Sequence, residues 1–270
     1  MYKEQSVRVS RHFNGIKDKL DSTLYRNTAM LTKRSQRYLL LSLLWGFCLA
    51  LILGGIHRPA IAHINATTIV EILDGEEVFI ENQQAKVDDR ATFQQTIQTQ
   101  ESRASLLFNN SAAGRMGPES SITVGQCIEV QQGSLLASGP ANGCTANFTI
   151  DVQGTVYMME VNEQGESSLK VLEGEVEVTP KGNTKPIAIN QGEQLNISPD
   201  GIFGKIVALS QGDVESLLRG VLFEGFEVEI PGMEKLQAAL ENLYPNIDLP
   251  RLPGFSRPNI PRPRIPRPFF

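Results

Sequence analysis

The longest uncharged segment of the chain, Tyr38 to Ile56, places the strongest constraint on what the rest can become. Its residues, YLLLSLLWGFCLALILGGI, would span about 28 Å as a helix, close to the thickness of a bilayer's hydrocarbon core. Because the run has no polar face, it is typical of a membrane span rather than of a buried core helix. No second run of this kind follows, so we expect the remaining chain to lie on one side of one membrane.

The charges that flank this run predict its orientation. Residues 1–37 hold nine Lys and Arg against three acids, whereas Arg58 is the only base close behind the run. Basic flanks stay in the cytoplasm. We therefore expect a short basic cytoplasmic segment at 1–37, a transmembrane helix at 38–56, and a C-terminal part in the periplasm of a bacterial inner membrane.

The same run also fits the h-region of a cleaved signal peptide. Ala60-Ile61-Ala62 matches the A-x-A cleavage pattern, and Met30 would open a signal peptide of conventional length. Two pairs of alternatives therefore stay open: a start at Met1 or at Met30, and an anchored protein or one secreted to the periplasm after cleavage at Ala62. Either way the same domain lies outside the cytoplasm.

Charge is strongly segregated beyond the first segment. Residues 38–250 hold twenty-seven acids and eleven bases, a net charge of −16, whereas residues 251–270 hold five Arg and no acid. Nucleic-acid binding needs clustered bases on the folded body, so this balance excludes a nucleic-acid partner. We expect a protein or an envelope polymer as the partner, and not a small-molecule ligand.

Two cysteines, Cys127 and Cys144, lie beyond the apolar run. Thiols outside the cytoplasm oxidise readily, and GPANG at 139–143 predicts a chain reversal that brings the two together. We predict a disulfide between them; the alternative is a pair of small buried apolar residues. Since no histidine follows His63, we expect no metal site and no cofactor.

Residues 67–198 have the pattern of a mainly β domain. The runs 67–73 and 76–81 are separated by Asp74-Gly75, which predicts a hairpin with a two-residue turn. Glycines punctuate the later runs, and EVEV at 175–178 alternates with period 2. We predict an antiparallel β-sandwich or jelly-roll-like domain. The later runs lie at 103–109, 121–124, 127–131, 134–138, 148–152, 155–161, 168–172, 175–178, 186–190 and 193–198.

The period changes to that of helices at 211–243. Asp213 predicts the cap of a helix that runs to about Phe223, and Pro231-Gly232 precedes a second helix from Met233 to Leu243. We expect the pair to pack on the β domain; the alternative is a dimer or partner contact through an exposed stripe. The two apolar stripes comprise Val214, Leu217, Leu218, Val221 and Leu222, and then Leu236, Ala239, Leu240 and Leu243.

The segment 245–270 is a Pro- and Arg-rich tail. From residue 250 onward it holds seven prolines and five arginines, a composition that forbids helix and sheet and favours extended polyproline II. One alternative is a disordered tail. The other is a cationic arm that contacts an anionic surface or a partner's groove, through Arg257, Arg262, Arg264, Arg267, Phe269 and Phe270.

The chain lacks the residues that common catalytic sites need. Without histidine past His63 there is no Ser-His or Cys-His pair, and the G-x-S-x-G, phosphate-loop and H-E-x-x-H motifs are also missing. The adjacent acids Asp88-Asp89 and Glu76-Glu77 lie in turn-like contexts that are typical of a solvated surface. We predict a protein that is not an enzyme; an envelope glycan hydrolase that uses a carboxylate pair is the least favoured alternative.

Five motifs, taken in order, resemble a FecR-type domain. The resemblance covers about 67–198, half of the chain, and implies a β domain outside the cytoplasm whose motifs describe the fold and not an active site. The motifs are IQTQESRASLLF (97–108), GPESSITV (117–124), QGTVYMMEV (153–161), VLEGEVEV (171–178) and Gly192-Glu193. The turn and fold residues that it implies are Gly154, Thr155, Tyr157, Glu173, Gly174, Gly192 and Glu193.

FecR proteins are inner-membrane regulators whose cytoplasmic domain controls an extracytoplasmic-function sigma factor. Residues 1–37 are too few to bury the core of such a domain. We therefore expect a non-catalytic binding or sensing module of the bacterial envelope. The alternative is FecR-type transmembrane signalling, in which the basic segment contacts a cytoplasmic regulator.

Overall fold

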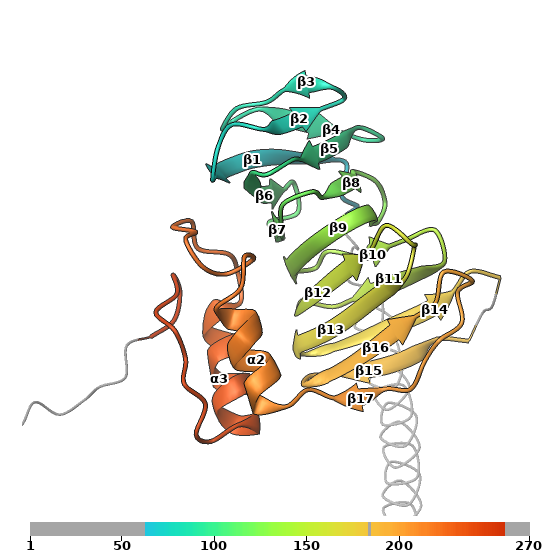
Figure 1. Ribbon diagram of the computed structural model, residues 1–270, viewed down its shortest axis with the longest axis vertical. Coiled ribbons are helices and arrows are strands. Elements are labelled where there is room, and N and C mark those ends of the chain that lie inside the picture. Colours follow the sequence, from blue (N-terminus) through green and yellow to red (C-terminus); the bar gives the residue numbers. More distant parts are fainter. Residues whose placement is uncertain (1–62, 183–184, 257–270) are drawn as a thin grey trace, which may run out of the picture. The chain divides into compact units, whose positions relative to one another are not determined.

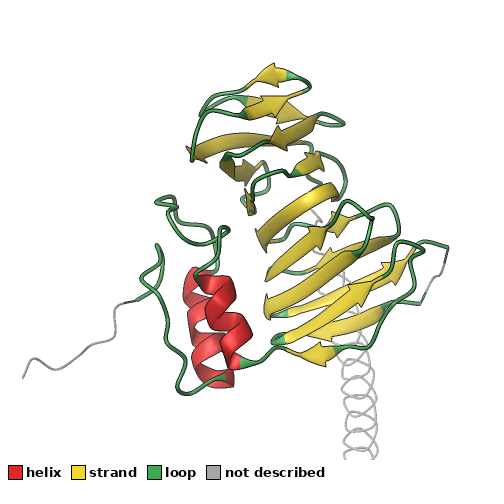
Figure 2. Ribbon diagram, viewed as in Figure 1, coloured by secondary structure: helices red, strands yellow, loops and turns green. Residues whose placement is uncertain are grey.

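The computed structural model describes residues 63–182 and 185–256 (Figure 1). The basic segment, the apolar run, the cleavage motif and the tail from residue 257 onward lie outside the described residues. Within the described ranges, no helix is long and apolar enough to cross a membrane. The chain is mainly β with two helices, which confirms the predicted fold class (Figure 2).

Two sheets face each other, and every strand pair in the first, sheet A, is antiparallel. In spatial order sheet A comprises β4 (Arg90–Thr92), β1 (Ala66–Leu73), β6 (Arg103–Phe108), β7 (Ala113–Met116), β9 (Ile128–Gly139), β12 (Thr155–Val161), β13 (Ser167–Glu173), β16 (Glu193–Ile197) and β17 (Val207–Ala208). The second, sheet B, comprises β3 (Gln83–Gln84), β2 (Val78–Ile80), β5 (Thr96–Thr99), β8 (Ser121–Thr123), the first part of β9, β10 (Gly143–Cys144), β11 (Phe148–Val152), β14 (Glu175–Pro180) and β15 (Ile187–Asn190).

Strand β9 belongs to both sheets. Its first part pairs with β8 and, in parallel, with β10, whereas the part from Gly133 onward pairs with β12 and, from Leu135, with β7. Gly133 takes φ +83°, and a Cβ atom there would lie 2.5 Å from the Cα of Ser120. Only glycine fits both the left-handed backbone and the close approach, so this residue lets one strand cross between the sheets.

The predicted hairpin of the first two runs is wrong. β1 pairs with β4 and β6 in sheet A, whereas β2 pairs with β3 and β5 in sheet B. Asp74 and Gly75 both have positive φ and carry the chain from one sheet to the other. This arrangement buries Ile69 and Val78 in one core between the sheets, which two adjacent strands of a single sheet would not enclose.

A layer of two helices covers the outer face of sheet A, so that this sheet is buried on both faces over much of its area. α2 (Gln211–Leu218) and α3 (Met233–Leu243) pack against outward side chains of the sheet such as Leu136, Val156 and Met158. The bounds of α3 confirm the second predicted helix. The shared apolar cluster confirms that the helical pair packs on the β domain.

The first helix is shorter than predicted. Ser210, and not Asp213, is the N-cap: its Oγ accepts from the backbone N–H of Asp213, whose carboxylate accepts from the N–H of Ser210 in return. The helix ends at Leu218, because Arg219 and Gly220 turn the chain into a loop. Val221, predicted in the buried stripe, is 50% exposed as a result.

Candidate functional site

A row of polar side chains crosses four strands of sheet A beyond the edge of the helical layer. The register pairs Ser134 of β9 with Glu160 of β12, Glu160 with Ser168 of β13, and Ser168 with Asn196 of β16. Neighbouring strands lie about 4.8 Å apart, so the row is about 14 Å long. We call these four residues the polar row.

The adjacent row of the same face is covered. One pleat closer to the helices, the register aligns Leu136, Met158, Lys170 and Gln194. Leu136 and Met158 are buried in the cluster that α2 and α3 close. The helical cover therefore stops between two neighbouring rows, and the polar row is left open.

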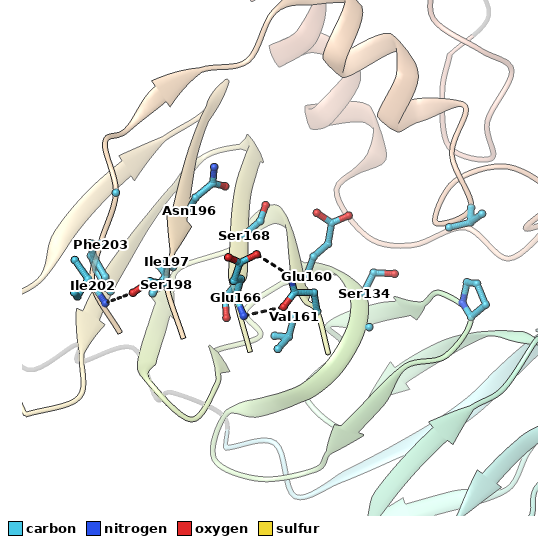
Figure 3. Close-up of a pocket in the computed structure, with 16 residues that line it drawn as sticks. Ser134, Glu160, Val161, Glu166, Ser168, Asn196, Ile197, Ser198, Ile202 and Phe203 are labelled. Atoms are coloured by element: carbon cyan, nitrogen blue, oxygen red, sulfur yellow. Dashed lines mark hydrogen bonds between the residues drawn. The ribbon is translucent and has the colours of Figure 1, made fainter. Parts of the chain in front are cut away.

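The polar row forms the floor of a groove of about 900 Å³ (Figure 3). Pro118 and Val221 close the end near β9. Ile202 and Phe203 close the end near β16, where Gly204 donates to the carbonyl oxygen of Asn196 at 2.8 Å. The groove therefore has a polar floor and two apolar ends, and it runs across the strands.

Two carboxylates line the groove, and a base within the fold neutralises one of them. Glu160 forms an ion pair with Lys170 of the neighbouring covered row. Glu166, in the turn between β12 and β13, accepts from Asn162 Nδ2 at 2.8 Å. No Lys, Arg or His is among the described residues that line the groove. This combination favours a cationic ligand that also offers hydrogen-bond acceptors and apolar groups.

A second, smaller hollow continues the groove along the flank of α2. It has a volume of about 470 Å³ and shares Glu160 and Val221 with the groove. Asp213 lines it from the first turn of α2, and hydrogen bonds from Ser210 lower the pKa of its carboxyl. Lys170 lines this hollow as well, so the carboxylates of Glu160 and Asp213 face one basic side chain there.

The loop that carries Val221 is fastened to sheet A by arginine side chains. Arg115, fully buried on β7, donates to the carbonyls of Leu222 and Val228 at 3.2 and 2.8 Å. Desolvation by this burial lowers its pKa to about 10. Arg103 of β6 donates to the carbonyl of Val221 at 2.6 Å. These long-range bonds set the position of the apolar end near β9.

Both guanidinium groups also lie against the same aromatic ring. The Cζ atoms of Arg115 and Arg103 are 4.5 and 5.3 Å from the centroid of the Phe226 ring. Arg103 forms an ion pair with Asp74, which lowers the pKa of that carboxyl. Glu71 of β1 accepts from the N–H groups of residues 227 and 228 on the same loop that carries Val221. The arginines therefore have a structural explanation and are not a ligand site.

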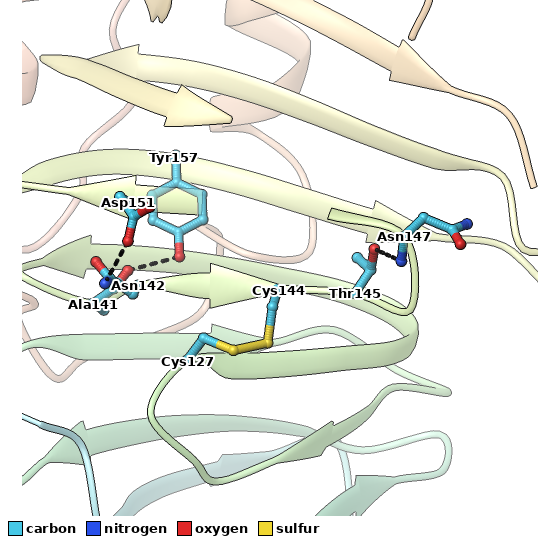
Figure 4. Close-up of a disulfide and its surroundings, with 8 residues drawn as sticks. All are labelled: Cys127, Ala141, Asn142, Cys144, Thr145, Asn147, Asp151 and Tyr157. Atoms are coloured by element: carbon cyan, nitrogen blue, oxygen red, sulfur yellow. Dashed lines mark hydrogen bonds between the residues drawn. A yellow bond between two sulfur atoms is a disulfide. The ribbon is translucent and has the colours of Figure 1, made fainter. Parts of the chain in front are cut away.

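The predicted disulfide is confirmed and lies away from the groove. Cys127 and Cys144 are bonded with their Cα atoms 5.7 Å apart, where the parallel pair of β9 and β10 begins (Figure 4). Nearby, the hydroxyl of Tyr157 donates to the carbonyl of Ala141 at 2.8 Å, and complete burial raises the pKa of this phenol. The disulfide therefore fastens the chain reversal at 139–143 to sheet B.

The other residues named by the resemblance lie in turns and at strand ends. Gly154, Gly174 and Gly192 have φ values of +105°, +84° and +77°. A Cβ on Gly174 would lie 2.8 Å from the Cγ2 of Thr155. Glu193 accepts from the backbone N–H of residue 190 at 2.7 Å, within its own turn.

Glu173 lies where β13 passes beneath α3. Partial burial raises the pKa of its carboxyl, and the charge of Lys235 on α3 opposes that shift. Neither Glu173 nor the six other residues that the resemblance names line the groove. The Arg and Phe residues of the predicted contact tail lie outside the described residues.

Sequence reasoning therefore missed the groove. A signal was present, because Glu160, Ser168 and Asn196 are polar residues on the outward parity of three strands whose inward residues are mostly apolar. That parity does not distinguish an open surface from one that a helix covers. The polar row is open because α2 ends at Leu218, and the sequence pattern did not predict that end.

No protein-family model matches this chain, and no curated protein matches it. Among solved structures, it is similar to two crystal structures of a "putative anti-sigma factor" from Parabacteroides distasonis, with 12% sequence identity and TM-scores of 0.41 and 0.40. The matches cover 46% of this chain and 65% and 64% of those chains, so less than two thirds of their length is spanned. A partial likeness at this level assigns neither a family nor a function.

Proposed function

We propose that this protein is a non-catalytic binding module that holds an extended polypeptide segment in the groove over the polar row. The observation that carries the proposal is the uncovered row of Ser134, Glu160, Ser168 and Asn196, on a sheet face that the helical layer buries elsewhere. A floor of about 14 Å accommodates four or five residues of an extended chain at about 3.1 to 3.4 Å each.

A peptide suits the groove better than a sugar chain or a reacting substrate. The aromatic residue in the lining, Phe203, packs edge-on against Phe148 with ring centroids 6.2 Å apart, so it is held as part of the wall. The carboxylates of Glu160 and Glu166 each have a neighbouring donor within the fold. Serine, asparagine and carboxylate groups instead match the carbonyls and cationic side chains of a polypeptide.

We place the module outside the cytoplasm, either anchored through 38–56 or released after Ala62. The Cys127–Cys144 disulfide supports this location, because such bonds persist in oxidising compartments. The test is the mature N-terminus of the protein isolated from its cells. A first residue of His63 would establish the released form and would exclude FecR-type signalling through residues 1–37.

The binding role can be tested with a displayed library of random twelve-residue peptides and the full chain as bait. We expect selection of peptides whose binding is lost in Ser168→Lys, since a longer cationic side chain fills the floor and repels cations. Glu177→Lys is the matched control, because residue 177 is exposed on β14 of the other sheet. Failure to select any peptide, or equal binding by both variants, would overturn the proposal.

A further inference from the structure

We propose that the groove's occupant is the chain's own Pro- and Arg-rich tail, residues 257–270, which reaches it across α2 within one molecule. The inference rests on the proposed function, because it names the partner of the same groove. A cationic segment and an anionic groove that belong to one chain meet without any external partner.

The chemistries of tail and groove are complementary. Residues 257–270 hold four Arg and no acid, whereas the groove holds Glu166, Glu160 in its ion pair with Lys170, and no basic lining residue. In a polyproline II rod, Arg264 and Arg267 lie three residues apart on one side, about 9 Å along its axis. This spacing lets both guanidinium groups face the acidic side of one groove about 14 Å long.

Proline content also matches the polar row. Five of the fourteen tail residues are proline and have no N–H, so the rod offers mainly carbonyl oxygens that accept hydrogen bonds. The hydroxyls of Ser134 and Ser168 and the amide of Asn196 are donors along the floor. Because the groove runs across the strands, it presents side chains and not a backbone ladder, which suits a segment that cannot pair as a strand.

The point where the tail leaves the described fold is within reach of the groove. Ser256 donates its N–H to Gln237 Oε1 of α3 at 2.7 Å, and Gln237 Nε2 donates back to its carbonyl. α3 and α2 lie side by side (Figure 1), and the groove lies on the opposite flank of α2. Crossing two helix spacings requires about 20 Å. Fourteen residues of polyproline II span about 43 Å, so residues from about 263 onward can reach the polar row.

The apolar ends of the groove supply the remaining complementarity. Ile202 is 68% exposed and Val221 is 50% exposed, although each is a large apolar side chain. The reaching part of the tail contains Ile265, Phe269 and Phe270. Seating these side chains at the two ends would remove apolar surface from water on both partners.

Occupation by the tail would regulate access to the groove. A segment tethered in the same molecule has an effective concentration in the millimolar range, so an external polypeptide must bind better than the tail to displace it. The tail would then act as a built-in competitor, and its removal should strengthen binding of external peptides.

The test is a photo-crosslinking amino acid placed at Ile202 of the full chain, the exposed residue at the end of the groove near β16, with mass spectrometry of the adducts. We expect an adduct with residues 263–270 in a species of monomer size. The same amino acid at Glu177, on the exposed face of sheet B, is the positional control and should give no tail adduct. An adduct in a species of dimer size would mean that a second copy supplies the tail, and would overturn the intramolecular assignment.

Charge-reversed tails provide a second test that does not depend on folding of the groove. Arg264→Glu with Arg267→Glu should reduce the Ile202 adduct about tenfold, by loss of favourable charge interactions and the repulsion that replaces them. Arg251→Glu with Arg257→Glu carries the same change of charge on residues that lie before Ser256 or directly after it and cannot reach the polar row, and should leave the yield unchanged. Equal yields from the two variants would overturn the proposal.

The outcomes separate this inference from the proposed function. If residue 202 crosslinks to a selected external peptide but never to the tail, the tail assignment fails and the peptide-binding role stands. If residue 202 crosslinks to no polypeptide at all, both fail. An increased affinity for the selected peptide after deletion of 257–270 supports both.

Discussion

The two sheets of the sandwich differ in what covers their outer faces, although strand pairing is antiparallel throughout sheet A and in all but one pair of sheet B. Sheet A is apolar on both faces where the helices cover it, and its strand β12, TVYMMEV, is buried at six of seven positions. Sheet B is covered on one face only, and its strand β14 begins EVEV, with valines buried and glutamates exposed. The difference shows that a strand covered on both faces is apolar at nearly every position, whereas a strand covered on one face alternates between apolar and polar residues.

At the groove, sheet A changes from a sheet that is covered on both faces to one that is covered on a single face. Met158 and Glu160 share the outward face of β12 two residues apart, yet the first is 7% exposed under the helical layer and the second lines the open groove. A binding surface here needs no special motif. The surface is open because the layer of α2 and α3 ends one row of side chains before the end of sheet A.

The largest expected effect concerns the buried outer face of sheet A. Leu136→Ala should lower the free energy of unfolding by about 2–5 kcal/mol, because it removes a fully buried side chain beneath the helices. Glu177→Ala, on the outer face of sheet B, should change it by no more than about 0.5 kcal/mol. Urea unfolding of both variants measures the contrast, and similar small losses would mean that the helical layer contributes little to sheet A.

Sheet B has no second apolar layer and depends more on its disulfide. Replacing both Cys127 and Cys144 by serine should cost about 3 kcal/mol, since the bond closes a loop with a sequence separation of 17. The unmodified protein with its bond reduced is the control, because it loses the bond and keeps both side chains. Urea midpoints of the three samples provide the measurement, and an unchanged midpoint for the double variant would show that sheet B holds together without the bridge.

A smaller effect is expected at the start of the helical layer. Ser210→Ala removes the cap of α2 and should cost about 1 kcal/mol. Ser216→Ala, exposed in the middle of the same helix, should be close to neutral. If thermal unfolding shows equal midpoints for the two variants, the capping box does not secure the cover of sheet A.

How much of this could be predicted from sequence differs between elements. Most long strands, the bounds of α3 and the disulfide pair follow from local patterns, because period, turn glycines and cysteine spacing are local. The predicted runs missed β4, β5 and β7, and the runs 127–131 and 134–138 form the single strand β9. The position of Val221 does not follow from a local pattern, since its carbonyl, in the loop after α2, accepts from Arg103, which lies 118 residues away in the sequence. The hairpin error has the same origin: Asp74-Gly75 indicates a turn, but not whether the turn stays within one sheet.

The smallest expected effect is on the pH dependence of the free energy of unfolding, through Glu173, which lies where α3 covers β13. Burial raises the pKa of Glu173 in the folded protein above its ordinary value of 4.5. Its contribution to stability is therefore complete below pH 4.5 and is lost as pH rises through the folded pKa. Glu173→Gln should weaken that loss, so its free energy of unfolding should fall less than that of the unmodified protein as pH rises from 4.5 towards 7. Glu175→Gln, an exposed position on β14 of sheet B, should leave the pH profile unchanged. Urea unfolding across this pH range compares the variants, and identical profiles for both would mean that α3 does not shield this edge of the sheet from water.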